Sequence, residues 1–214
     1  MLRFSRPKKP ADPLRERFGL KREGLRPGVR AAFDALLDEN ADLRRRLAEA
    51  ESLADHDTLT SALNRRAFMR ALHGAMSYAE RYKTPAAVLY IDLDGFKAIN
   101  DNFGHAAGDA VLKHIANLLR AQVRESDTVG RIGGDEFALI LVHASLEEAK
   151  KKAASLEEAI RANPATFAGV THRIAASVGV HGLTLVEDPE HALARADEAM
   201  YAAKHARKRA LEER

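Results

Sequence analysis

The sequence predicts an α+β fold, with helices flanking a central, mainly antiparallel sheet and one long helix preceding that domain. After residue 56, short apolar runs typical of strands alternate with helical segments, and a tight hairpin joins two of the runs. Before residue 57, apolar residues recur with a period near 3.5 instead. A chain of 214 residues can hold one such domain and an extension.

Residues 1–28 are expected to form a flexible basic tail. Residues 1–30 contain ten Lys and Arg and three acids, a net charge of +7, which leaves −4 for the rest of a chain whose total is +3. Four prolines and no apolar period argue against packed structure there. The tail could contact a protein partner or an anionic membrane surface, or it could be solvated without a partner. No nucleic-acid partner is expected.

Residues 29–56 are predicted to form one dimerising coiled-coil helix. Its seam residues are spaced alternately four and three apart, and they are Val29, Phe33, Leu36, Asn40, Leu43, Leu47, Ala50 and Ala54. This spacing is the heptad pattern of a coiled coil, and one Asn at a seam position can set the register of a parallel dimer. The alternative is an amphipathic helix that packs on its own domain.

Residues 57–209 are predicted to form the α+β domain, followed by a short C-terminal tail at 210–214. Strands are expected at 86–91, 128–132, 136–142 and 173–180, and helices at 106–123, 147–162 and 189–207. A hairpin turn is predicted at Gly133-Gly134-Asp135. Paired glycines are expected in this turn because glycine adopts positive φ angles without steric cost.

Two acidic clusters stand at strand ends. Asp92 and Asp94 follow the buried run at 86–91, and they share one face of the strand because strand side chains alternate. Asp135 and Glu136 lie at the tip of the hairpin. Mg²⁺ takes one or two carboxylates together with substrate phosphates, so two neighbouring strand ends of this kind could hold it. Acidic residues are also common near turns without any metal, so both interpretations stay open on these clusters alone.

The segment after the first acidic cluster offers groups suited to a nucleotide. Gly95-Phe96-Lys97 begins a turn whose backbone N–H groups can hold phosphate oxygens, and Lys97 can neutralise their charge. Asn100 and Asp109 could recognise guanine, because a carboxylate accepts hydrogen bonds from the donor edge of that base. Helix capping is the alternative role for these two residues.

Five motifs, in order, resemble the GGDEF family of diguanylate cyclases. The signature pentapeptide is Gly133–Phe137, and the other matching segments are Asp57–Phe68, Asp92–Asp101, Gly104–Asp109 and Ala196–Lys204. The similarity extends over roughly residues 56–208. It departs at Ser61, where the family has Gly, and after Lys204, where a Gly-Arg-Asn-like ending is missing. The resemblance implies a palm-like sheet similar to nucleotidyl cyclases and some polymerases.

The resemblance also implies that two GTP molecules are converted into cyclic di-GMP and two pyrophosphates. Asp92, the Leu93 carbonyl, Asp135 and Glu136 would form the Mg²⁺ site, with Mn²⁺ as an alternative ion, and Glu136 would assist the reacting 3′-hydroxyl. The catalytic residues would be Asp135, Glu136, Lys97 and Lys204. The GTP-binding residues would be Gly95, Phe96, Lys97, Asn100, His105, Asp109, Arg131, Gly133, Gly134 and Lys204.

Such a domain is half of an active site. The 3′-hydroxyl of each GTP attacks the α-phosphate of the other, so two domains must face each other, and a homodimer formed through residues 29–56 would bring them together.

Arg124-Glu125-Ser126-Asp127 resembles the family's R-x-x-D motif, at which the product binds and inhibits. Arg124 would contact guanine and phosphate and Asp127 would accept from guanine, whereas the alternative is a surface ion pair. A further basic residue often completes this site. Ser155 stands near the expected place, so Lys151, Arg161 or the second chain would have to supply the charge.

Two other functions remain open on the sequence. A catalytically silent cyclic di-GMP receptor would use Arg124 and Asp127 alone, and a related cyclase would make a different cyclic purine nucleotide. The absence of cysteine and of a long apolar stretch favours a cytoplasmic protein, and the resemblance implies a bacterial one, which a partner or a membrane surface could recruit.

Overall fold

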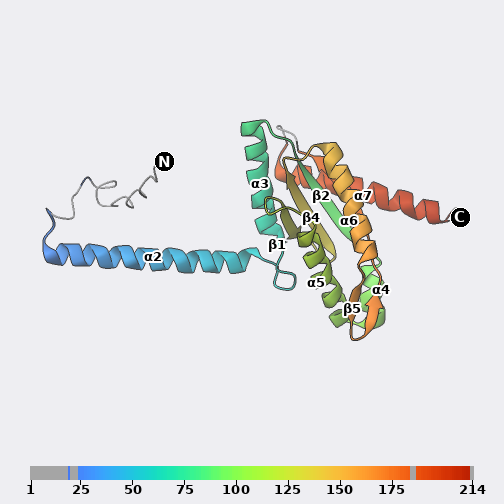
Figure 1. Cartoon of the computed structure of the whole chain (residues 1–214), viewed down its shortest axis with the longest axis horizontal. Helices are drawn as coiled ribbons and strands as arrows, with labels where there is room; N and C mark the ends of the chain where they lie inside the picture. Colours follow the sequence, from blue (N-terminus) through green and yellow to red (C-terminus); the bar gives the residue numbers. More distant parts are fainter. Residues whose placement is uncertain (1–18, 20–23, 184–186, 213–214) are drawn as a thin grey trace, which may run out of the picture. The chain divides into compact units, whose positions relative to one another are not determined.

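The computed structural model describes residues 19, 24–183 and 187–212, and its internal contacts divide the chain into two units, Met1–Leu53 and Ala54–Arg214 (Figure 1). Most of the predicted basic tail at 1–28 and part of the predicted C-terminal tail at 210–214 lie outside the described residues. Within the described part of the chain, no helix is both long and apolar enough to cross a membrane.

Helix α2 spans Pro27–Asp55 and carries the predicted heptad seam. Proline suits the first turn of a helix because its missing N–H would have no partner there. Three seam residues, Val29, Leu36 and Leu43, are 52%, 62% and 53% exposed. Apolar residues exposed at heptad spacing leave this face of the helix available to a partner.

The central sheet has five strands in the order β1-β3-β4-β2-β7. In chain order they are β1 (Leu63–Asn64), β2 (Ala86–Asp94), β3 (Thr128–Arg131), β4 (Glu136–Val142) and β7 (Ala175–Gly182). Only β1 and β3 pair in parallel, and the other neighbours are antiparallel. The predicted mainly antiparallel sheet is therefore confirmed, although β2 and β7 each extend further toward their C-terminal ends than predicted.

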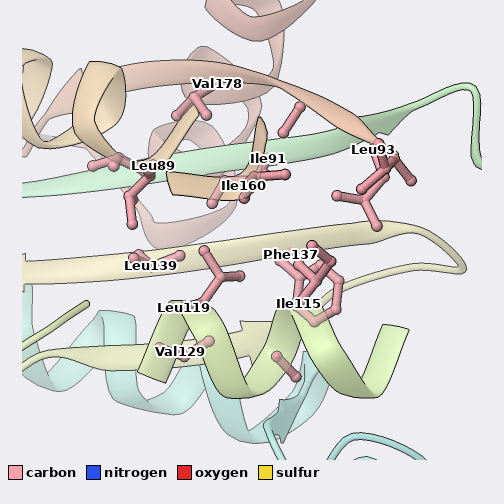
Figure 2. Packing of buried hydrophobic residues seen from close by; sticks show 14 of the residues in the cluster. Leu89, Ile91, Leu93, Ile115, Leu119, Val129, Phe137, Leu139, Ile160 and Val178 are labelled. Atoms are coloured by element: carbon pink, nitrogen blue, oxygen red, sulfur yellow. The ribbon is translucent and has the colours of Figure 1, made fainter. Parts of the chain in front are cut away.

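Helices cover both faces of this sheet. The helices are α3 (Arg65–Tyr82), α4 (Phe96–Phe103), α5 (His105–Ala121), α6 (Leu146–Ala162) and α7 (Pro189–Glu212). Residues of α4, α5 and α6 share one buried cluster with Leu89, Ile91 and Leu93 of β2 (Figure 2). Residues of α3 and α7 share a second cluster with Val88 and Tyr90. The alternation along β2 thus places Asp92 and Asp94 on the α3 and α7 face.

Apart from the two-residue strand β1, three features of the described chain were not predicted. Helix α3 has apolar residues at helical spacing, and α4 begins directly after Gly95, whose φ of 81° places it in the left-handed region. The third is a small hairpin made of β5 (Ala165–Phe167) and β6 (Val170–His172). The hairpin lies beside α5, where His114 Nε2 is 2.8 Å from the carbonyl oxygen of Asn163.

Gly179 of β7 lets helix α7 approach the sheet closely. A Cβ atom at this position would lie 2.0 Å from the Ala196 carbonyl oxygen and 2.2 Å from the Met200 nitrogen. Both atoms belong to the backbone of α7, so no side-chain rotation could relieve the overlap. The distance of α7 from the sheet therefore depends on this glycine, and α7 also carries Lys204.

Gly179→Ala should lower the free energy of unfolding of the second unit by about 1–3 kcal/mol, because α7 must move outward. Gly182→Ala is the matched control in the same strand. Its added Cβ would make ordinary contact with Leu146 at 3.6 Å, so we expect a change within about 0.5 kcal/mol. Urea unfolding of both variants measures the difference, and equal stabilities would contradict the packing role of Gly179.

Candidate active site

The register of β2 and β4 brings the two acidic clusters together. Asp92 pairs with Glu136 across the two strands, and the Leu93 N–H donates to the Asp135 carbonyl oxygen at 3.3 Å. The two predicted clusters are therefore neighbours at one end of the sheet. The Leu93 side chain is buried in the core, so only its backbone is available to this site.

The acidic groups disfavour one another's charge. Burial raises the pKa of Asp135, and the charge of Asp92 raises it further. Burial raises the pKa of Glu136 most, and together with the charges of Asp135 and Asp92 it outweighs a hydrogen bond from Tyr90 that lowers it. Burial beside Glu136 and Asp197 raises the pKa of Tyr90 as well. The site thus holds more negative charge than its own surroundings neutralise.

Lys204 of α7 forms ion pairs with the carboxylates at the end of β2. Its Nζ donates a hydrogen bond to Asp92 and lies 3.6 Å from Oδ1 of Asp94. Burial lowers the pKa of Lys204, but the hydrogen bond and charge of Asp92 outweigh that effect and raise it. This shared partner confirms that Asp92 and Asp94 lie on one face of β2. Asp94 also accepts hydrogen bonds from the buried Ser177 hydroxyl at 3.0 Å.

The two hairpin glycines do not play the predicted conformational role. Neither Gly133 nor Gly134 has a positive φ, so that expectation is wrong. A Cβ at Gly133 would instead lie 1.9 Å from Oε2 of Glu136, so this glycine makes room for the carboxylate. A Cβ at Gly134 would meet nothing within 4 Å, which leaves its surroundings open to a ligand.

Arg131 connects the hairpin to Asp57 through hydrogen bonds. Its Nη2 and Nε donate to the Gly134 carbonyl oxygen at 2.7 and 3.1 Å, and its Nη1 donates to Asp57 at 3.0 Å. Asp57 also accepts hydrogen bonds from the Thr60 hydroxyl and N–H. Because these contacts occupy the guanidinium, a role for Arg131 in binding nucleotide stays a prediction.

Asn100 and Asp109 come from two consecutive helices that pack closely. Asn100 lies on α4 against Gly108 of α5, where a Cβ would be 2.0 Å from Oδ1 of Asn100. Gly104 links the helices with a φ of 81°. Asp109, the next residue after Gly108, is exposed, as is His105 at the first position of α5. The predicted guanine-binding residues therefore lie close to the junction of α4 and α5, which we call the corner of these two helices.

The predicted phosphate-binding turn is the first turn of α4. Gly95 precedes the helix without a side-chain cap, and Lys97 is exposed. The first N–H groups of a helix have no partner within the helix, and they carry partial positive charge. The start of α4 can therefore bind an anion with backbone and side-chain groups together.

A cavity of about 400 Å³ adjoins the acidic cluster. Its lining residues are Asp92, Glu136, Asp197, Met200, Tyr201, Lys204 and His205. The sequence motifs assign no role to Asp197, Tyr201 or His205, although positions four and eight residues after Asp197 share one face of a helix with it. The Tyr201 and His205 rings lie 4.2 Å apart at this cavity.

The donors at this end of the sheet do not form a closed metal site. Among the described residues, no group of three or more His, Asp or Glu side chains is arranged to hold a metal ion. Mg²⁺ does not need such a cage, because it keeps waters and substrate phosphates as ligands. The carboxylates of Asp92 and Asp135, which repel each other, are donors of the type it prefers.

The R-x-x-D segment lies in another part of the fold. Arg124 and Asp127 precede β3, whereas the acidic hairpin follows this strand. They line a separate cavity of about 350 Å³ together with Lys151 and Ser155. Arg161 instead pairs with Glu158. The structure therefore places Lys151, not Arg161, beside Arg124.

The family model described as "Diguanylate cyclase, GGDEF domain" matches residues 54–210. Diguanylate cyclase TpbB of Pseudomonas aeruginosa is 42% identical over 183 residues, which cover 80% of this chain and 41% of TpbB. Probable diguanylate cyclase DgcE of Escherichia coli is 36% identical over 174 residues, which cover 79% of this chain and 16% of DgcE. The chain thus spans less than half the length of both relatives.

Solved structures show the same architecture. The coiled coil and GGDEF domain of DgcB from Caulobacter crescentus, in complex with c-di-GMP, matches with a TM-score of 0.74 and 26% identity, over 83% of this chain and 95% of that one. Diguanylate cyclase SiaD from Pseudomonas aeruginosa, in complex with its activator SiaC, matches with a TM-score of 0.71 and 29% identity, over 82% and 68% of the two chains.

The Asp57 cluster should make stability depend on pH. Burial raises the pKa of Asp57, but its hydrogen bonds to Thr60 and the charge of Arg131 outweigh burial and lower it below the ordinary value of 3.8. Asp57→Asn should therefore lower the free energy of unfolding by about 1–3 kcal/mol at pH 7. Because the folded-state pKa is lowered, this contribution is complete above the unfolded-state pKa and is lost as the pH falls through the folded value.

Urea unfolding of the wild type and Asp57→Asn between pH 7 and pH 3 measures this contribution. The difference should shrink as the pH falls, whereas Asp101→Asn, which changes an exposed carboxylate, should match the wild type throughout. A difference of constant size across this range would contradict the charged role of Asp57.

Proposed function

This chain belongs to the GGDEF family of diguanylate cyclases, and we propose that it condenses two molecules of GTP into cyclic di-GMP and two molecules of pyrophosphate. One observation carries the proposal: the carboxylates of Asp92, Asp135 and Glu136 meet at two neighbouring strand ends, beside a cavity that Lys204 also lines. The family match and the names of the relatives support the same activity.

The acidic cluster is suited to a divalent cation. Burial and then the neighbouring carboxylates raise the pKa values of Asp135 and Glu136, and a cation would neutralise the negative charge gathered there. Asp92, the Leu93 carbonyl and Asp135 would hold Mg²⁺, or Mn²⁺ in its place, with Glu136 beside them. When bound, the ion would supply positive charge against the phosphates of GTP.

Each condensation step forms one bond and breaks another. The 3′-hydroxyl oxygen of one GTP bonds to the α-phosphorus of the other, and the bond from that phosphorus to the pyrophosphate oxygen breaks. Glu136 is placed to accept the hydroxyl proton, because its carboxylate lines the cavity in which the reacting hydroxyl would lie. Lys204 and Lys97 offset the charge that accumulates on the phosphate oxygens.

The GTP molecule would lie between the acidic hairpin and the corner of α4 and α5. Its terminal phosphates would contact the backbone N–H groups of Gly95 and Phe96 and the ammonium of Lys97. The guanine base would be recognised by Asn100 and Asp109, with His105 nearby. Lys204, which donates to Asp92 in the described structure, would also reach the phosphates. The open space at Gly134 would let the nucleotide approach the hairpin backbone.

The active form would be a homodimer. One domain presents one GTP, so the second reactant must come from a second domain that faces it. Val29, Leu36 and Leu43 leave an apolar face of α2 exposed, which supports pairing with the same helix of another copy. The similar DgcB structure also combines a coiled coil with this domain.

Product inhibition is proposed at the second cavity. Arg124, Asp127 and Lys151 line it, so it offers cations to phosphates and a carboxylate to a purine edge. The DgcB structure, which matches this chain, was solved in complex with c-di-GMP. We place the whole reaction in the bacterial cytoplasm.

Asp135→Asn should reduce cyclic di-GMP synthesis by about 100-fold or more, because the amide cannot supply the charge that holds a cation. The fold should be retained, since the substitution removes a charge that its buried surroundings disfavour. Purified protein with GTP and Mg²⁺, followed by chromatography of the products, measures the rate, and thermal unfolding checks the fold.

Glu80→Gln is the control, because Glu80 is an exposed carboxylate on α3 outside the site. Synthesis by Asp135→Asn within twofold of the wild type would contradict the metal assignment. A wild type that makes no cyclic di-GMP at any protein concentration but binds it would instead support a catalytically silent receptor.

Leu36→Glu combined with Leu43→Glu should separate the dimer, because two charges would enter the apolar seam. At low protein concentration we expect most activity to be lost, and it should recover as the concentration rises. Sedimentation and initial rates across a dilution series measure both effects. Ala35→Glu combined with Ala41→Glu adds the same charge outside the seam and should stay dimeric and active. Loss of the dimer without any loss of activity would contradict the proposal.

A further inference from the structure

The cavity beside Arg124 is lined by charged side chains and by one aromatic residue, His143. It has a volume of about 350 Å³ and is lined by residues that precede β3, by the end of β4 with the two residues after it, and by α6. A cavity of this size can accept a nucleotide-sized group. His143, which directly follows β4, is one of the lining residues, although it belongs to none of the sequence motifs.

The acidic groups of this cavity are engaged in the fold. The two carboxylate oxygens of Asp127 accept hydrogen bonds from the N–H groups of Arg124 at 3.0 Å and Val142 at 3.2 Å. Glu148 accepts the N–H of Ser145 at 2.8 Å and completes the cap of α6. Their negative charge is thus partly compensated by donors of the protein itself.

Two cations of the cavity keep their donors available. Lys152 donates to the carbonyl oxygen of Gln122. Within the described parts of the chain, neither the Arg124 guanidinium nor the Lys151 ammonium forms a hydrogen bond or a salt bridge with another residue. Together they give the cavity a cationic side that suits phosphate oxygens.

The His143 ring belongs to a row of three aromatic rings in contact. The Tyr78 and Tyr82 ring centroids are 4.5 Å apart, and those of Tyr78 and His143 are 5.7 Å apart with an interplanar angle of 86°. His143 has a φ of 52°, a left-handed conformation that few non-glycine residues adopt. The Tyr78 contact orients the imidazole of His143, which is one of the residues that line the cavity.

The His143 ring keeps a face available for stacking. A perpendicular contact with Tyr78 covers at most one face of the imidazole, and the residue as a whole is exposed. A purine base can stack on such a face while its phosphates lie toward the cations. This pairing of a flat ring with nearby positive charge is the usual way in which proteins bind nucleotides without reading the sequence of bases.

We propose that His143 is a stacking platform for a purine base of the nucleotide whose phosphates are held by Arg124 and Lys151. The inference rests on the proposed inhibitory function of the same cavity, and it adds a base-binding residue that lies outside the R-x-x-D motif. Replacement of a stacking ring by alanine weakens nucleotide binding by about 5- to 150-fold. The effect should depend on the ring and not on its nitrogens.

Isothermal titration of the full chain with cyclic di-GMP tests the proposal. His143→Ala should weaken binding by about 5- to 150-fold, and His143→Phe should bind within about threefold of the wild type. Both variants place a non-glycine residue in the left-handed conformation, so any effect of backbone strain on binding is the same in both. The difference between their affinities therefore measures the contribution of the aromatic ring. His73→Ala, an exposed histidine of α3 outside this cavity, is the matched control and should bind as the wild type does.

Arg124→Ala separates this inference from the function on which it rests. If Arg124→Ala weakens binding while His143→Ala binds as the wild type does, the stacking role is wrong and the inhibitory cavity stands. If Arg124→Ala also binds as the wild type does, the nucleotide binds elsewhere and both proposals fail. Equal weakening in His143→Ala and His143→Phe would show that an imidazole nitrogen, and not stacking, holds the ligand.

Discussion

The pairing of β2 with β4 is the constraint on which the site depends. Its register sets Asp92 opposite Glu136 and brings Asp135 beside Leu93, so three carboxylates meet at one end of the sheet. Burial and mutual repulsion raise the pKa values of Asp135 and Glu136. The fold holds this charge because strand pairing and core packing fix the backbone positions of these residues.

Compensation for this charge comes from residues distant in sequence. Gly179 lets α7 approach the sheet, and from α7 Lys204 reaches Asp92. Gly133 leaves space for the Glu136 carboxylate, while Arg131 ties the hairpin carbonyl to Asp57. The acidic groups are therefore already positioned before a cation or a nucleotide phosphate binds. Lys204 would then turn from Asp92 toward the phosphate.

Sequence periodicity predicted much of this arrangement. The alternation along β2 placed Asp92 and Asp94 on one face, and a shared contact with Lys204 confirms it. The prediction that Gly133 is needed for a positive φ was wrong. A larger residue there would instead clash with the Glu136 side chain, and turn preferences read from the sequence do not reveal such a contact. The sequence also could not predict the position of the His143 ring, or whether Lys151 or Arg161 lies beside Arg124. Both depend on how α3 and α6 pack around β4.

Anomalous diffraction from crystals grown with Mn²⁺ and a non-hydrolysable GTP analogue tests the central claim most directly. The account predicts a manganese peak bound by Asp92 and Asp135, with the triphosphate beside it and Lys204 turned toward the phosphates. A nucleotide bound at the corner of α4 and α5 without manganese at these carboxylates would contradict the account. So would a manganese peak elsewhere in the domain.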